Sequence, residues 1–128
     1  PERIIIVTGR YNNLIQKTIK QFIEEKYYDK LIFVIQETPM GTGHAISCTL
    51  SNYNEDEMVL ILNGDTPNIS SNLLQKFTNR YENRLLISVI EEPAGYGRII
   101  MNEKDEIQKI VEEKDACESE KQINKINS

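Results

Sequence analysis

Three short runs dominated by apolar residues constrain the fold of this chain more than any other feature. β-Branched residues dominate the first two runs, and none of the three alternates between apolar and polar residues. Continuous runs of this kind are typical of strands that are buried on both faces of a parallel sheet. The runs are residues 3–8, 31–35 and 58–62.

Each run is followed by a segment with helical spacing of its apolar residues. The first helix is expected to begin at Asn12, a good N-cap residue, and to extend to about residue 26, and the second should cover about residues 44–52. Ser70 or Ser71 can cap a third helix that carries Leu73, Leu74 and Phe77. Three strand–helix units in series predict a parallel sheet with right-handed crossovers.

The pattern changes after residue 84. Strands are expected over residues 85–90, 97–101 and 107–111, and residues 102–105 should form a polar turn. The charged segment 112–125 is expected to be a loop that returns to the edge of the sheet. The sequence therefore predicts a single α/β domain over residues 1–128, with βα units in 1–84 and added antiparallel hairpins in 85–128.

Composition excludes several classes of protein. The 128 residues are 39% hydrophobic and 27% charged, as in ordinary globular proteins, so a disordered or collagen-like chain is excluded. A net charge of −5 has the wrong sign for gripping nucleic acid, and no apolar run is long enough to cross a membrane. The two cysteines, Cys48 and Cys117, form no C-x-x-C pair, which indicates free thiols in a cytoplasmic protein.

Candidate binding residues lie where the parallel strands end, because open α/β sheets bind ligands beyond the carboxyl ends of their strands. Gln36 offers a donor and an acceptor that could read an imide edge such as that of uracil, although a plain polar strand end is as good an interpretation. Gly41 and Gly43 allow close approach of the backbone at a helix start. His44, the single histidine, is better explained by packing than by catalysis.

Two further segments carry polar groups at strand ends. Asp65 follows the third run and could hold Mg²⁺ against a phosphate, or it could simply form a turn before Pro67. Gly97 follows Tyr96, and Glu112 ends a strand; a bare backbone N–H and a carboxylate of this kind can bind a sugar, but a tight turn is the simpler explanation.

Five blocks, taken in order, resemble the uridyltransferase domain of N-acetylglucosamine-1-phosphate uridyltransferase, the pyrophosphorylase half of a bifunctional bacterial enzyme. The combination of Q-x-x-x-x-G-T-G-H-A with G-D-T-P and G-Y-G-R-I is far more specific than any single block. The blocks are residues 36–45 (QETPMGTGHA), 62–67 (LNGDTP), 95–99 (GYGRI), 110–116 (IVEEKDA) and 122–127 (QINKIN).

This resemblance implies a Rossmann-like nucleotidyltransferase fold, UTP and a sugar 1-phosphate as substrates, and UDP-N-acetylglucosamine and pyrophosphate as products. It implies that Gln36 and the backbone of Gly41 and Thr42 hold the uracil, and that Asp65 binds the catalytic Mg²⁺. It further implies that the N-acetylglucosamine moiety is bound by Gly97, Glu112 and Asn127.

The sequence also departs from the family pattern. The block L-A-A-G-x-G-T-R-M, which supplies a phosphate-gripping arginine in the family, does not occur, so we expect the central first strand to be absent and these 128 residues to be inactive alone. The strands flanking that gap should pair with each other or accept a strand from a second copy, unless a longer parent supplies it. Two alternatives remain: a noncatalytic nucleotide-binding module, and specificity for another sugar or base.

Overall fold

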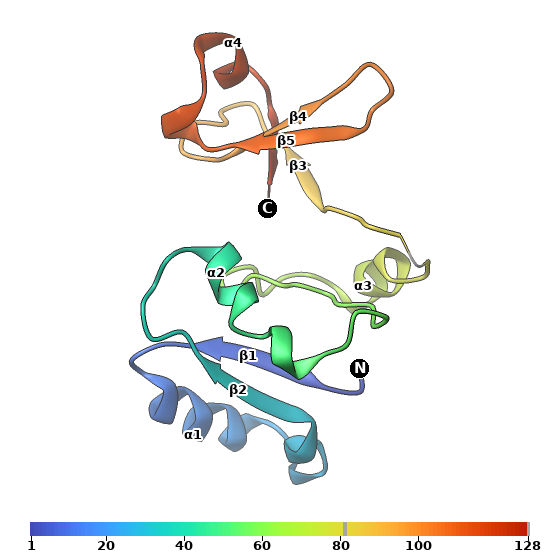
Figure 1. Cartoon of the computed structure of the whole chain (residues 1–128). Helices are drawn as coiled ribbons and strands as arrows, with labels where there is room; N and C mark the ends of the chain where they lie inside the picture. Colours follow the sequence, from blue (N-terminus) through green and yellow to red (C-terminus); the bar gives the residue numbers. More distant parts are fainter. Residues whose placement is uncertain (81, 128) are drawn as a thin grey trace. The chain divides into compact units, whose positions relative to one another are not determined.

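Figure 1 shows the computed structural model of the chain, which describes residues 1–80 and 82–127. The residues group into two compact units, Pro1–Met58 and Val59–Ser128, which are considered separately below. Both units contain helices and strands, so the α/β class expected from the sequence is confirmed.

The first unit contains two of the expected parallel strands. β1 (Ile4–Thr8) and β2 (Leu31–Ile35) pair in parallel, with Ile4 opposite Leu31 and Thr8 opposite Ile35. The 11-residue helix α1 (Asn12–Phe22) and the 3₁₀ helix η1 (Glu25–Lys30) connect them. The strand–helix–strand unit that the apolar runs predict is therefore present (Figure 1).

The start of α1 differs from the prediction. Tyr11, not Asn12, occupies the N-cap position, and no side chain caps the helix there. The Asn12 carboxamide oxygen instead accepts hydrogen bonds from the Thr8 hydroxyl (2.8 Å) and from Gln16 Nε2 (3.1 Å). Asn12 thus ties the end of β1 to the first turn of α1, because a short polar side chain can bond the neighbouring strand instead of the helix backbone.

The second predicted helix is divided. α2 (Thr42–Ser47) ends before Cys48, and a separate 3₁₀ turn, η2 (Leu50–Asn52), follows it. Arg3 holds this turn by donating to the Asn52 carbonyl at 2.7 Å and by pairing with Glu57. Arg3 therefore links η2 and Glu57 to the start of β1.

The third predicted strand does not form. Residues 58–62 have no strand assignment, and their apolar side chains are 37–57% exposed. A strand needs a neighbour for its N–H and C=O groups, and the described part of the chain supplies none to this run. In the described residues, β1 has β2 as its single strand partner.

The second unit is built on an antiparallel sheet. α3 (Ser71–Phe77) comes first, with the predicted N-cap Ser70 accepting a hydrogen bond from Leu73 N at 3.2 Å. The sheet order is β3-β6-β4-β5, from β3 (Ile87–Val89), β4 (Arg98–Met101), β5 (Ile107–Val111) and β6 (Lys125–Asn127). The expectation of a mostly parallel sheet is thus met only in the β1–β2 pair.

The segment 112–125 is not the loop that its charge suggests. It forms η3 (Glu113–Asp115) and α4 (Glu118–Lys121) before leading into β6. β6 pairs with both β3 and β4, so the tail returns to the interior of the sheet and not to its edge (Figure 1). The main buried apolar residues of this unit are Ile99, Val111, Ala116 and Ile126.

None of the helices in residues 1–80 and 82–127 combines the length and the apolar character that a membrane span requires.

Candidate functional site

Three of the predicted site residues lie at one end of three neighbouring strands. Arg98 on β4 is opposite Val111 on β5 and opposite Ile126 on β6. Gly97 precedes Arg98, while Glu112 and Asn127 follow the two partner residues. Because all pairs are antiparallel, the register brings Gly97, Glu112 and Asn127 to the same end of β4, β5 and β6.

The side chain of Asn127 lies close to the backbone of Gly97. A Cβ atom at this position would lie 2.7 Å from Asn127 Oδ1, so no larger residue fits without moving that side chain. The Asn127 backbone N–H also donates to the Gly97 carbonyl at 3.4 Å. Gly97 is buried, Asn127 is half-buried and Glu112 is exposed. A carboxamide, a carboxylate and a glycine backbone together offer the donors and acceptors that a sugar ligand needs.

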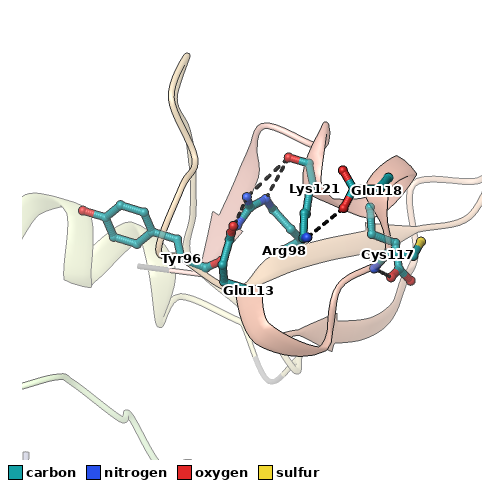
Figure 2. Close-up of polar contacts among 7 residues, drawn as sticks. Tyr96, Arg98, Glu113, Cys117, Glu118 and Lys121 are labelled. Atoms are coloured by element: carbon teal, nitrogen blue, oxygen red, sulfur yellow. Dashed lines mark hydrogen bonds and ion pairs between the residues drawn. The ribbon is translucent and has the colours of Figure 1, made fainter.

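Arg98 anchors this end of the sheet. Its side chain is 1% exposed, and Nη2 lies 2.6 Å from Glu113 Oε2 (Figure 2). The guanidinium also donates to the Tyr96 carbonyl and, from Nε and Nη2 at 3.4 and 3.3 Å, to the Lys121 carbonyl. One buried arginine thus holds η3 and the end of α4 against the start of β4, which fixes the backbone beside Glu112 and Gly97.

The sequence pattern alone predicts no role for Arg98, although the residue lies within the motif G-Y-G-R-I. The available signal was an arginine directly before the apolar residues Ile99, Ile100 and Met101, with two glutamates after the next strand. A charge at the start of a buried strand needs a charged partner, and Glu113 is that partner.

A second polar group supports α4. Glu120 accepts hydrogen bonds from Lys109 Nζ at 2.8 Å and from the Cys117 backbone N–H at 2.9 Å. The hydrogen bond from Lys109 is the main cause that lowers the pKa of Glu120 to about 2, followed by the bond from the Cys117 N–H. The ion pair of Glu118 with Lys121, drawn in Figure 2, raises the pKa of Lys121 and lowers that of Glu118.

In the first unit, the structure brings Gln36 and Gly41 together. Gln36 Nε2 donates to the Gly41 carbonyl at 3.2 Å and lies 2.9 Å from His44 Nδ1. Gly41 has φ +92° and ψ 177°, a conformation reserved for glycine, and it precedes Thr42, the exposed first residue of α2. An open depression of about 290 Å³ lies at the carboxyl ends of β1 and β2, and Gln36 lines it with Gly9 and Arg10.

Asp65 lies in an exposed turn. The Asn63 carbonyl accepts from the Thr66 N–H (3.4 Å) and from its hydroxyl (3.0 Å), so Gly64 and Asp65 are the central turn residues. The motifs also lead us to expect Asp65 to face Gln36 and Gly41 across a shared Mg²⁺. Because Asp65 belongs to the second unit and Gln36 to the first, this closeness stays a prediction.

Magnesium is compatible with Asp65 as a single protein ligand. Across residues 1–80 and 82–127, no group of three or more His, Cys, Asp and Glu side chains could enclose a metal ion. Mg²⁺ is commonly held by one or two carboxylates, with water and substrate phosphates completing its coordination. The exposed carboxylate of Asp65 fits that donor set, which needs no protein cage.

No protein-family model matches the chain. It is similar, however, to the "Bifunctional protein GlmU" of Thermoanaerobacter pseudethanolicus, with 38% identity over an alignment of 132 residues. The alignment covers 99% of this chain and 27% of that protein. The "Probable UDP-N-acetylglucosamine pyrophosphorylase" of Acanthamoeba polyphaga mimivirus is 38% identical over 135 residues, which cover 99% of this chain and 51% of that protein. The GlmU protein of Francisella philomiragia is 38% identical over 131 residues, covering 100% of this chain and 27% of the relative.

The identity extends over both units, and it agrees with the five motif blocks, which run from residue 36 to residue 127. The chain spans between about a quarter and about half of the length of the relatives it matches. It belongs to the family of the GlmU and UDP-N-acetylglucosamine pyrophosphorylase proteins, as its motifs indicate.

Proposed function

We propose that this chain is part of an N-acetylglucosamine-1-phosphate uridyltransferase that has a Rossmann-like nucleotidyltransferase fold and works in the cytoplasm. In the proposed reaction, an oxygen of the sugar 1-phosphate attacks the α-phosphorus of UTP. The bond from that phosphorus to the bridging oxygen of the β-phosphate breaks, and pyrophosphate leaves. The products are UDP-N-acetylglucosamine and pyrophosphate.

The observation that carries the proposal is the shared position of Gly97, Glu112 and Asn127 at one end of β4, β5 and β6. These residues are 15 positions or more apart in pairs along the chain, and they belong to three different motif blocks of the family. In the proposal, the Gly97 backbone and the Asn127 carboxamide bind the acetamido group of the sugar, while Glu112 accepts hydrogen bonds from its hydroxyls.

The proposed uracil site uses Gln36 and the backbone of Gly41 and Thr42. The hydrogen bond from Gln36 to the Gly41 carbonyl supports this role, because it couples the side chain to the glycine loop that would carry the base. The depression lined by Gln36 at the ends of β1 and β2 lies where open parallel sheets bind ligands.

Asp65 is proposed to bind Mg²⁺ beside the phosphates of UTP. The ion would neutralise phosphate charge that builds up as pyrophosphate leaves. Asp65 is suited to this role because its carboxylate is exposed at a turn.

The proposal is tested by pyrophosphate release from UTP, N-acetylglucosamine 1-phosphate and Mg²⁺, measured on the full natural chain that carries these residues. Asn127→Ala should raise the KM for the sugar phosphate by about tenfold, the value of one hydrogen bond, and leave the KM for UTP unchanged. Asn124→Ala, a matched change three residues earlier at an exposed position, should alter neither KM.

Two outcomes would contradict the proposal. Equal effects of Asn127→Ala and Asn124→Ala would remove Asn127 from the sugar site. Binding of UTP in calorimetry without any turnover by the full natural chain would favour the alternative of a noncatalytic nucleotide-binding module. The isolated 128 residues are expected to show no turnover, since they contain no L-A-A-G-x-G-T-R-M block.

A further inference from the structure

The contacts of Gln36 determine which way its side-chain amide points. The atom 3.2 Å from the Gly41 carbonyl oxygen must be the NH₂ group, because a carbonyl oxygen can only accept a hydrogen bond. The same NH₂ group lies 2.9 Å from His44 Nδ1. Nδ1 must therefore accept, and the neutral imidazole carries its proton on Nε2, which faces Cys48 Sγ at 4.0 Å.

This arrangement uses both N–H groups of Gln36. One hydrogen points to Gly41 and the other to His44, so the carbonyl oxygen Oε1 is the atom left to meet a ligand. In the described part of the chain, no residue donates a hydrogen bond to Oε1. In this arrangement Gln36 presents an acceptor to a ligand, while its donors are used within the chain.

An acceptor at this point discriminates between pyrimidines. Uracil carries a hydrogen on ring N3, which can donate to Oε1, whereas cytosine has a lone pair at N3, which would face Oε1 unfavourably. A site built to bond a ligand N–H rejects a ligand that lacks it, because the site's own polar atom is then left unpaired.

We propose that His44 is a positioning residue that fixes the Gln36 amide and thereby sets the preference of the site for a base with a ring N–H. This inference rests on the proposed function only in that Gln36 reads the base. With the Gly41 contact alone, the whole amide could still rotate and offer its second N–H to a ligand. The second contact, to His44 Nδ1, occupies that N–H and holds the amide plane.

The geometry is tested without substrate or turnover. Long-range ¹H–¹⁵N spectra of the full natural chain, recorded in weakly alkaline solution, report which ring nitrogen of its His44 carries the proton. We expect the proton on Nε2. A proton on Nδ1 would overturn the inference whatever the enzyme does.

The selectivity is tested with two variants of nearly equal shape. Asn in place of His can put an acceptor at the position of Nδ1, whereas Leu has the same branching without a polar atom. We expect His44→Leu to reduce the preference for UTP over CTP, measured as the ratio of the two Kd values by calorimetry, by about tenfold, the value of one hydrogen bond. His44→Asn should restore most of that ratio.

Thermal melting of both variants separates a loss of selectivity from a loss of folding. A His44→Leu variant that melts as the parent does and keeps the parental UTP-to-CTP ratio overturns the inference. So does a His44→Asn variant whose ratio falls as far as that of His44→Leu. If instead the unmodified protein binds UTP no better than CTP, the proposed function fails, while the tautomer measurement still decides the geometry.

Discussion

At the residue scale, Glu120 illustrates how one carboxylate organises a charged segment. It bonds both Lys109 on β5 and the backbone N–H of Cys117, so it joins the sheet to the start of α4. Its pKa falls from an ordinary value of 4.5 to about 2 because both partners favour the ionised form, with the Lys109 bond the larger cause.

This lowered pKa predicts how stability depends on pH. Above about pH 4.5, Glu120 is ionised in both the folded and the unfolded chain, so its stabilisation is fully present. As the pH falls toward 2, the unfolded chain takes up the proton first, and the stabilisation is lost. Glu120→Gln should therefore lower the melting temperature at about pH 6 and have little effect at about pH 2.

The matched control is Glu103→Gln, at an exposed position in the turn between β4 and β5. It should leave the melting temperature nearly unchanged at both pH values. A Glu120→Gln deficit of the same size at both ends of the range would show that the carboxylate acts by packing and not by charge.

At the element scale, the loop before α2 depends on backbone conformation at a single glycine. Gly41 and Gly43 both have open space where a Cβ would be added, but only Gly41 has a positive φ, at +92°. The two positions thus separate conformational strain from steric fit.

Alanine substitutions at these glycines should have opposite effects. Gly41→Ala forces a strained backbone and should destabilise the chain by about 1–3 kcal/mol. Gly43→Ala lies within α2 and should stabilise it by about 0.5–1 kcal/mol, because it reduces the freedom of the unfolded chain. Urea unfolding at equilibrium measures both values, and a destabilising Gly43→Ala would mean that this glycine has a role beyond the helix.

The sequence predicts an element well where the local residue pattern by itself favours that element. The strands β1, β2 and β5 are predicted nearly to the residue, and Ser70 marks the start of α3. α4 and β6 were missed because the pattern of residues 112–125 is dominated by charge, and their positions depend on contacts with distant residues. Arg98 was missed for a related reason, since its partners Glu113 and Lys121 follow it by 15 residues or more.

At the scale of the whole molecule, the described residues form one antiparallel and one parallel sheet. The sheet of β3 to β6 has four strands, whereas the β1–β2 sheet has two. The residues predicted to bind sugar lie together because the antiparallel pairing of β4 with β5 and with β6 fixes their register. The predicted relation between Asp65 and Gln36 depends on segments from both units, which sequence patterns constrain less.

Residues 58–62, where the predicted strand does not form, lead to a prediction about self-association. This run is apolar enough for a central strand, yet its side chains are 37–57% exposed and it has no strand partner among the described residues. Exposed aliphatic segments with unpaired backbone groups tend to pair with another chain. We therefore expect the 128-residue chain to self-associate, with a light-scattering mass that rises with concentration.

Charge placed in the run should oppose that association. Ile61→Lys, at the side chain that is 57% exposed, should keep the mass near that of one copy, since a lysine on a pairing strand disfavours edge-to-edge contact. Leu14→Lys introduces the same charge at a side chain of α1 that is 63% exposed, outside the run, and should leave association unchanged. If both lysines prevent association equally, net charge is responsible; if neither does, another surface joins the copies. Only a difference between them assigns the contact to residues 58–62.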